Sequence, residues 1–315
     1  MTLSRISYPV AFSLLPIFTC GMSHAQDTAF LPKFRADAQM VLVPVTVTDH
    51  YGKTIEGLQR ENFTVIDDQS PQHIASFSTA DAPCSVGLVV DISGSMRDSL
   101  HTAKEVTRAF LGTANPEDEF LLLTVSTDPQ AVSGFTKDVA AVERSVAAAR
   151  PGGSTALIDT VYLGLTRMKN ARRPRRALLI LSDGMDNHSR YSKSELMRVA
   201  LEADVQIYTI ITDGIPDGTF PMRPAMVRKP WDNGEQNQGR SLLEDLADKT
   251  GGLHFRVRTD AAGDAAMKAA QAIRSQYVIG YQSPDPGDSG KWHRLRVKLD
   301  VPHLNVYARN GYYSK

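Results

Sequence analysis

The sequence has few of the features on which covalent cross-linking or nucleic-acid binding depends. Only two of its 315 residues are cysteine, which excludes a disulfide framework and a cysteine-rich zinc site. Lysine and arginine together number 35, as do aspartate and glutamate, so the formal charge is zero and no basic excess indicates a nucleic-acid partner. Hydrophobic residues make up 42% of the chain and charged residues 22%, proportions typical of a globular protein. At roughly 150 residues per domain, the length favours two domains.

The apolar run near the N-terminus is too short for a membrane span. It extends from Tyr8 to Cys20, whereas crossing a bilayer takes about 20 apolar residues. The run follows the lone charge of Arg5 and precedes Ser23-His24-Ala25, a small-x-small cleavage pattern. These features predict a signal peptide over residues 1–25, and therefore export to the periplasm or secretion with no transmembrane span. Cys20 leaves a second interpretation open, a lipid-anchored N-terminus, although the residues before it fit a lipoprotein signal poorly.

The middle of the chain alternates short apolar runs with segments of helical periodicity. The runs predict buried strands at 85–91, 120–125, 177–183, 205–212 and 253–257. The periodic segments predict helices near 100–111, 139–146, 157–168, 194–203, 241–249 and 262–274. Strands that alternate with helices indicate an α/β fold, here a Rossmann-like, doubly wound and mostly parallel sheet covered on both faces.

The two ends of the chain have a different pattern, typical of half-buried β-strands. Valine occupies every second position from Val41 to Val47, and Pro44 within this run favours an edge strand. A hairpin is predicted from 63–66 and 74–77, and further strands at 277–281, 294–299 and 305–308. We expect a small β domain formed by both termini, with the α/β domain inserted into it. The predicted boundaries are a linker at 26–39, β segments at 40–80 and 276–315, and the α/β domain at 84–274.

Oxygen-bearing side chains follow three of the predicted elements of the α/β domain. Asp91, Ser93 and Ser95 come directly after the first buried strand, and Asp183 ends the strand at 177–183. Thr155 follows a Gly-Gly-Ser turn and begins a helix. Because ligands of open α/β sheets bind beyond the carboxyl ends of the strands, we expect these side chains to gather at one edge.

Five oxygen donors of which only two are carboxylates suit a hard cation. Mg²⁺ prefers oxygen ligands in octahedral geometry and usually keeps several waters. Two carboxylates would neutralise the ion, and three hydroxyls would add no charge. We therefore predict one Mg²⁺, or Mn²⁺, per chain, with a coordination position open to a carboxylate from outside.

These five residues resemble the DxSxS…T…D metal-ion-dependent adhesion site of von Willebrand factor type A domains. The resemblance implies that Ser93, Ser95 and Thr155 coordinate the ion directly, and that Asp91 and Asp183 act partly through water. It also implies that an acidic residue of a partner protein completes the coordination shell. Residues 45–78 and 276–313 resemble the flanks of the exported bacterial VWFA-related domain family, which implies secretion and a binding role but names no ligand.

Several residues near the predicted site have simpler interpretations. Asp91 and Ser93 could merely cap the following helix, and the site could be degenerate and bind no metal. Asp186 and Asn187 could tune the site, but a solvated turn is the simpler prediction. The basic run at 172–176 precedes a strand, so it is predicted at the sheet edge opposite the metal, as a solvated loop or, alternatively, a patch for an acidic partner.

Three functions from different classes follow. The leading one is an exported, metal-dependent protein-binding module that is not an enzyme. The second is a structural or assembly factor with the same fold and no metal dependence. The third is a metal-assisted hydrolase with Ser93 or Ser95 as nucleophile, although no general base is evident beside either serine.

The segment 213–240 lacks a periodic pattern and is rich in proline and glycine. Connections in compact domains usually take about 4–6 residues, and much longer loops are often functional. The segment follows the strand at 205–212, so it should leave the sheet at the metal edge. We expect it to border the ion and select the partner, or else to be an insertion that packs against the domain.

Overall fold

The computed structural model describes residues 40–79, 81–212, 232–257, 261–283 and 290–314. The predicted signal peptide, the linker and Cys20 lie outside these residues, and so does segment 213–231. None of the helices in the described part combines the length and apolar character that a membrane span requires.

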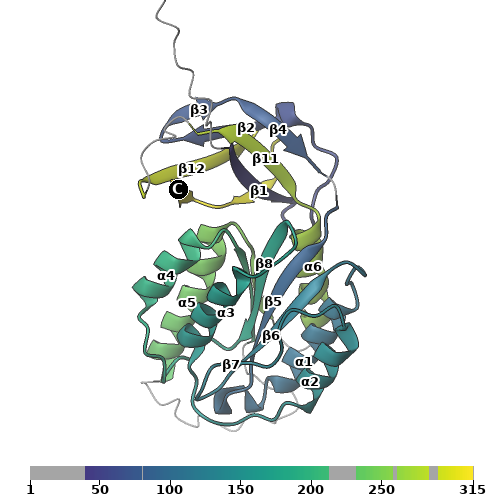
Figure 1. Cartoon of the computed structure of the whole chain (residues 1–315), viewed down its shortest axis with the longest axis vertical. Coiled ribbons are helices and arrows are strands. Elements are labelled where there is room, and N and C mark those ends of the chain that lie inside the picture. The colour runs from purple at the N-terminus through teal and green to yellow at the C-terminus, as the bar shows by residue number, and fades with distance from the viewer. Residues whose placement is uncertain (1–39, 80, 213–231, 258–260, 284–289, 315) are drawn as a thin grey trace, which may run out of the picture. The chain divides into compact units, whose positions relative to one another are not determined.

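A six-stranded sheet with helices on both faces forms the middle of the chain (Figure 1). Its strand order is β10-β9-β8-β5-β6-β7, and every neighbouring pair is parallel except β6 and β7. The strands are β5 (Cys84–Asp91), β6 (Glu119–Val125), β7 (Gln130–Ala131), β8 (Arg175–Ser182), β9 (Gln206–Thr212) and β10 (His254–Val257). The helices are α1 (Leu100–Leu111), α2 (Val139–Ala148), α3 (Leu157–Met168), α4 (Lys193–Glu202), α5 (Asp232–Thr250) and α6 (Ala262–Arg274). The predicted doubly wound, mostly parallel fold is confirmed for this part of the chain.

Two separate hydrophobic cores lie on the two faces of this sheet. One buries Val86, Leu88 and Val90 of β5 against α1, α2 and α6. The other buries Val89, together with side chains of α3, α4 and α5. The helices accordingly lie in two groups on either side of the sheet (Figure 1). Alternate side chains of a strand point to opposite faces, so an uninterrupted apolar run supplies both cores at once.

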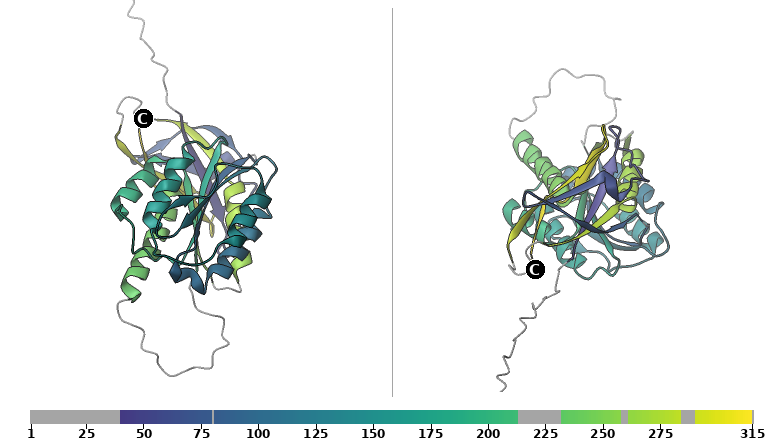
Figure 2. Two further views of the ribbon diagram at one scale, coloured as in Figure 1. Left: turned by 60° about the horizontal axis from the view of Figure 1, so that its bottom comes forward. Right: turned by 90° about the horizontal axis from the view of Figure 1, so that it is seen from above.

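The remaining strands form two four-stranded sheets around a third core. They are β1 (Met40–Thr48), β2 (Phe63–Asp67), β3 (Ser70–Gln72), β4 (Ile74–Ser78), β11 (Tyr277–Gln282), β12 (Trp292–Leu299), β13 (Asn305–Ala308) and β14 (Gly311–Tyr313), with a short 3₁₀ helix, η1 (Arg60–Asn62), before β2. The sheet orders are β13-β1-β11-β4 and β14-β12-β2-β3, so each sheet contains strands from both ends of the chain. Figure 2 shows the yellow C-terminal strands lying across the purple N-terminal ones. We call these eight strands the β unit.

Two details of the predicted β segments are wrong. The strand at 74–78 does not pair with β2; it pairs with β11 in the other sheet, and β2 pairs with β3 across a tight turn. Strand β1 is not an edge strand along its whole length, because residues 45–48 pair with β13 as well. Pro44 lies just before that stretch, in the part of β1 that pairs with β11 alone. Its missing N–H therefore interrupts no hydrogen bonds between β1 and β13.

Helix α5 corrects the interpretation of segment 213–240. Residues 232–240 are helical, although they contain two glycines and no apolar periodicity. Buried Leu242, Leu243 and Leu246 hold the helix on the sheet, and Gly239 meets the backbone of Gly184 where no side chain would fit. Tertiary contact therefore outweighs the low helix propensity of glycine here. The rest of the segment, 213–231, lies outside the described residues, so its predicted role in selecting a partner stays a prediction.

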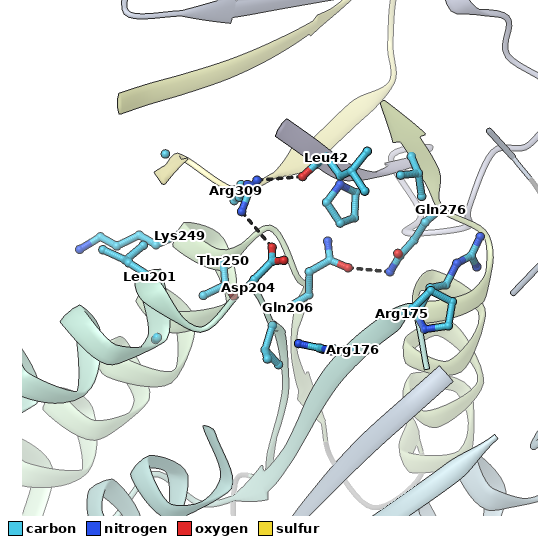
Figure 3. A pocket seen from close by; sticks show the side chains of 16 residues that line it. Leu42, Arg175, Arg176, Leu201, Asp204, Gln206, Lys249, Thr250, Gln276 and Arg309 are labelled. Atoms are coloured by element: carbon cyan, nitrogen blue, oxygen red, sulfur yellow. Dashed lines mark hydrogen bonds and ion pairs between the residues drawn. The ribbon is translucent and has the colours of Figure 1, made fainter. Parts of the chain in front are cut away.

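The amino ends of strands β8 and β9 lie next to the β unit. A small cavity of about 110 Å³ lies between them, lined by residues of both (Figure 3). Arg309 donates to the carbonyl of Leu42 at 2.8 Å and pairs with Asp204 at 2.9 Å, and Gln276 donates to Gln206 at 2.6 Å.

The basic run at 172–176 is not the solvated loop that the sequence predicts. Arg175 is buried at the start of β8, and its guanidinium donates to the carbonyl of Arg274. The backbone N–H of Arg172 donates to Glu119 at 2.7 Å, and that of Arg173 donates to Ser85 at 3.1 Å. The basic run does lie at the amino end of β8, away from the predicted metal edge, as the sequence predicts.

Candidate metal centre

The two carboxylates of the predicted site lie at the carboxyl ends of adjacent strands. Asp91 is the last residue of β5, and Asp183 directly follows β8. The two strands are parallel neighbours whose register pairs Val90 with Leu181. Both side chains are therefore delivered to the same edge of the sheet, and both residues are buried. This edge is opposite the one that faces the β unit.

Asp91 is held by hydrogen bonds to both of its carboxylate oxygens. The backbone N–H of Ser93 donates to Oδ1 at 2.9 Å. The hydroxyl of Ser182, the last residue of β8, donates to Oδ2 at 2.6 Å. The Ser182 hydroxyl in turn accepts the backbone N–H of Gly184 at 3.0 Å, so the two strand ends form one network. Sequence analysis does not identify Ser182, because a small polar residue inside an apolar strand carries no distinctive signal.

The two serines of the site bring their hydroxyls together. Ser93 precedes the short 3₁₀ helix η2 (Gly94–Arg97), whose turn places the Ser93 and Ser95 Oγ atoms 2.9 Å apart. Ser95 also hydrogen-bonds the carboxylate of Asp183. Ser93 is buried whereas Ser95 is exposed, so the cluster opens to solvent on the side of Ser95.

The loop that contains Thr155 is fastened to the loop that follows Asp91. The N–H of Gly94 donates to the carbonyl of Gly153 at 3.0 Å, and the N–H of Gly152 donates to the carbonyl of Ile92 at 2.9 Å. Gly153 has a φ of 78°, which glycine adopts without strain. Thr155 itself is buried. Three segments distant in sequence thus meet at one place.

The electrostatics of the site favour a cation. Burial raises the pKa of Asp91 to about 6; hydrogen bonds from Ser182 and Ser93 oppose this shift, and repulsion from Asp183 adds to it. Burial likewise raises the pKa of Asp183. The two buried carboxylates repel each other. A divalent ion bound between them would stabilise the ionised form of both.

Comparison with known families identifies this part of the chain. Residues 86–185, which include all five residues of the predicted site, match the family model of the von Willebrand factor type A domain. Residues 86–185 therefore belong to the von Willebrand factor type A family by sequence, and we call the α/β part that contains them the von Willebrand domain. The family predicted from the DxSxS…T…D pattern is therefore confirmed.

A curated relative is an uncharacterized protein of Borreliella burgdorferi. It is 22% identical over 203 residues, which are 59% of this chain and 58% of that protein. The match thus spans less than two thirds of the relative's length.

Solved structures with a similar fold share little sequence with this chain. A von Willebrand factor type A protein from Catenulispora acidiphila is 13% identical, with a TM-score of 0.49 over 89% of this chain and 75% of that one. The conserved hypothetical protein BatB from Bacteroides thetaiotaomicron is 16% identical, with a TM-score of 0.45 over 61% and 100%. The von Willebrand domain of the type V pili tip protein Mfa5 from Porphyromonas gingivalis is 14% identical, with a TM-score of 0.45 over 62% and 96%.

Asp186 and Asn187 do more in the von Willebrand domain than a solvated turn would. The Asp186 carboxylate accepts the N–H groups of Leu157 at 2.8 Å and Ile158 at 3.3 Å, so it caps the N-terminus of α3 from a distant loop. The Asn187 side chain accepts the N–H of Thr155 at 2.9 Å. Both residues therefore position the Thr155 loop, and the prediction of a mere solvated turn is wrong. Sequence alone suggests little here, because these bonds span about thirty positions.

Arg240 is a second residue that the sequence does not point to. Its Nε donates to the backbone carbonyl of Asp183 at 3.3 Å, and its charge lowers the pKa of that carboxyl against the raising effect of burial. It reaches the site because Gly184, at a φ of 84°, and Gly239 pack backbone to backbone. The first half of α5 thus contributes a cation beside the cluster.

The donor set fits a hard divalent ion. Two ligands 2.0–2.1 Å from an octahedral ion and 90° apart are separated by about 2.9 Å. The hydroxyl oxygens of Ser93 and Ser95 have that separation. All five predicted residues offer oxygen, and two of them are buried carboxylates, which is the chemistry that Mg²⁺ or Mn²⁺ prefers.

Proposed function

We propose that the chain is an exported, metal-dependent protein-binding module. Its binding site is formed by Asp91, Ser93, Ser95, Thr155 and Asp183, which hold one Mg²⁺ or Mn²⁺. An acidic side chain of a partner protein occupies the coordination position on the side of Ser95. The bound ion supplies the Lewis acidity that attracts this carboxylate.

The observation that carries the proposal is the convergence of the serine hydroxyls with two buried carboxylates. A mere helix cap would need one oxygen directed at backbone N–H groups. Here the Ser93 hydroxyl approaches the Ser95 hydroxyl, and Ser95 also bonds Asp183. Such a pairing of oxygen donors around a common point is typical of a cation site and costs stability when no ion neutralises the carboxylates.

Each residue has a distinct part in the proposed binding. Ser93 and Ser95 offer neutral oxygens, so the ion keeps enough positive charge to attract an outside carboxylate. Asp91 orients the Ser93 loop through the Ser93 N–H, and Asp183 orients Ser95. Asn187 orients Thr155 through its backbone N–H. Hydrogen-bonded residues of this kind set the geometry of a metal site as much as its ligands do.

The alternatives are less well supported. A hydrolase would need a base within hydrogen-bond reach of the nucleophile. The carboxylates that the serine hydroxyls contact, Asp91 and Asp183, are the ones that the proposal assigns to the ion, and a carboxylate held ionised by a bound cation is a weak base. A metal-independent assembly factor would bind its partners equally well in chelator, which makes it directly testable.

The first experiment measures metal binding. Mg²⁺ and Mn²⁺ are titrated calorimetrically into the purified chain, into Asp91→Ala and into Asp98→Ala, which removes an exposed carboxylate just beyond η2. We expect one ion per chain in the wild type and Asp98→Ala and none in Asp91→Ala. Equal affinity in all three would refute the site.

The second experiment tests the function. The wild type, Asp91→Ala and Asp98→Ala are used as bait for proteins of the exported fraction, with Mg²⁺ or with chelator. A metal-dependent module retains its partners only in Mg²⁺ and only with an intact Asp91. A partner retained equally in chelator by all three would favour the assembly factor.

A further inference from the structure

A second polar cluster lies in the β unit, far in sequence from the first. Asp67 ends β2, Asp68 follows it in the turn to β3, and His293 lies in β12. One carboxylate oxygen of each aspartate and one ring nitrogen of the histidine lie within 4.8 Å of one another. The cluster therefore joins the N-terminal and C-terminal segments of the chain.

Burial makes this cluster costly without a bound cation. The side chains of Asp67 and His293 are at most 1% exposed, whereas that of Asp68 is 41% exposed. Neither ring nitrogen of His293 has a hydrogen-bond partner, and neither does Oδ1 of Asp67. Buried polar atoms are nearly always paired, so Nδ1 of His293 and Oδ1 of Asp67, which lie near each other without a hydrogen bond, require an explanation.

The orientation of the His293 ring, more than the separations within the cluster, favours a coordination shell over an ion pair. His293 Nδ1 lies 3.4 Å from Asp67 Oδ1 and 3.1 Å from Asp68 Oδ2, yet makes a well-aligned hydrogen bond with neither. A hydrogen bond needs the N–H to point at the oxygen. Two ligands of a metal instead direct their lone pairs at a third point, and around tetrahedral Zn²⁺ at 2.0–2.1 Å they lie about 3.3–3.4 Å apart.

The surroundings fix each side chain in this arrangement. The hydroxyls of Tyr281 and Tyr312 both donate to Oδ2 of Asp67 at 2.8 Å, which leaves Oδ1 directed at the cluster. The ring of His293 stacks on Tyr312 with centroids 5.0 Å apart. Hydrogen-bonded carboxylates and a ring held by packing are what orient the ligands of a metal.

The turn between β2 and β3 holds Asp68 in place. Asp68 and Gln69 have φ values of 44° and 75°, as a two-residue hairpin turn of the primed type requires. The Asp68 N–H donates to the carbonyl of Arg294 at 3.0 Å, and the Arg294 N–H donates to Asp68 Oδ1 at 2.9 Å. Only Oδ2 of Asp68 is then left for His293 and for an ion.

We propose that Asp67, Asp68 and His293 bind a transition-metal dication of the Zn²⁺ class, at a site separate from the Asp91 cluster. An imidazole ligand favours Zn²⁺ over Mg²⁺ or Ca²⁺, which prefer oxygen alone. The ion enters from the exposed side of Asp68, where water completes its shell. It cross-links β2 to β12 and so ties together the two ends of the β unit.

The test measures zinc binding in a chain whose first site is disabled. Zn²⁺ is titrated into Asp91→Ala and into the same chain with Asp68→Asn, which keeps the oxygen that accepts from Arg294 and lies in an exposed turn. We expect one Zn²⁺ per chain in the first and no measurable binding in the second. Two matched controls, Asp300→Asn and His73→Gln, change an exposed aspartate and an exposed histidine of the β unit and should retain the ion.

Further measurements keep the proposal testable where a variant folds poorly. Tyr312→Phe removes one donor to Asp67 and should weaken zinc binding about 10–100-fold. In the wild type with excess Mg²⁺, Zn²⁺ should still raise the melting temperature, and a zinc-soaked crystal should give an anomalous peak between His293 and Asp68. Absence of zinc binding in Asp91→Ala, or zinc binding that persists in Asp68→Asn, overturns the proposal without bearing on the Mg²⁺ site.

Discussion

The von Willebrand domain and the β unit bury carboxylates in opposite ways. In the domain, Asp91 receives its hydrogen bonds from Ser93, two residues away, and from Ser182 on the neighbouring parallel strand. In the β unit, Asp67 receives its hydrogen bonds from Tyr281 and Tyr312, more than two hundred positions away.

The contrast shows when a polar cluster can be anticipated. Parallel strands end at a common edge, so the residues that follow them are brought together by topology alone. Antiparallel strands from opposite ends of a chain meet only through their register, and a shift of one residue turns every side chain to the other face. The following predictions test how far the two regions differ, starting with the largest expected effect.

Removal of residues 276–315 should disrupt the β unit. The deletion removes β11, β12, β13 and β14, and so exposes the core in which Val43, Val45 and Val65 are fully buried. We expect aggregation and loss of a cooperative thermal transition, measured by size-exclusion chromatography and calorimetry. Co-expression of 276–315 as a separate segment should restore solubility. A truncated chain that stays soluble and melts as cooperatively as the full one would show that the N-terminal strands fold without the C-terminal ones.

The ion-free domain should become more stable as the pH falls. The pKa of Asp91 is about 6 in the folded chain and about 3.8 when unfolded, so the folded state binds the proton more tightly. The resulting stabilisation is complete below about pH 3.8 and is lost as the pH rises through 6. It amounts to about 3 kcal/mol, from roughly 1.4 kcal/mol per pKa unit.

Asp91→Asn isolates this effect from other titrating groups. In chelator at pH 7.5 the variant should be more stable than the wild type, and the difference should shrink toward pH 4.5. The measurement is urea unfolding at several pH values. A stability difference that does not change with pH would mean that the buried carboxylate does not cause it. In Mg²⁺ at pH 7.5 the wild type should again be the more stable of the two.

Asp186→Ala should weaken the von Willebrand domain at the Thr155 loop. The change removes the acceptor for the N–H groups of Leu157 and Ile158, and loss of such a cap costs about 1–2 kcal/mol. It should also lower Mg²⁺ affinity about 10–100-fold, since the start of α3, which directly follows the Thr155 loop, is no longer fixed. Asp186→Asn keeps the accepting oxygen and should lose less of both. Unaltered Mg²⁺ affinity in Asp186→Ala would show that the cap of α3 does not affect the metal site.

Arg309→Ala should have the smallest effect, about 1 kcal/mol. The guanidinium pairs with Asp204 of the domain and with the carbonyl of Leu42 in the β unit, but partly exposed ion pairs contribute little. Asp204→Asn removes the charge of the pair and leaves the bond to Leu42. If Arg309→Ala instead costs several kcal/mol by urea unfolding, the two regions are coupled more strongly than the contacts in Figure 3 indicate.

Much of the fold follows from periodicity in the sequence. The helices at 100–111, 157–168 and 262–274 and the strand at 305–308 have the boundaries that the pattern predicts. The other predicted elements of the domain differ by one or two residues, except α5, and the short strand β7 was not predicted. Apolar runs and helical spacing indicate which face of each strand or helix must be buried, so local sequence determines these elements. The same logic places Asp91 and Asp183 at one edge of the sheet, while the role of the five residues as metal ligands stays a prediction.

Other features were decided only by tertiary structure. Helix α5 begins nine residues before the predicted one, because the contact between Gly239 and Gly184 depends on a segment more than fifty positions away. The pairing of β4 with β11 instead of β2, the capping of α3 by Asp186, and the approach of His293 to Asp67 are of the same kind. Each is a contact between residues whose separation in the chain carries no periodic signal. A sequence by itself determines which side chains must be buried and what local turns they allow, but only the packed chain decides which distant partner each buried polar group meets.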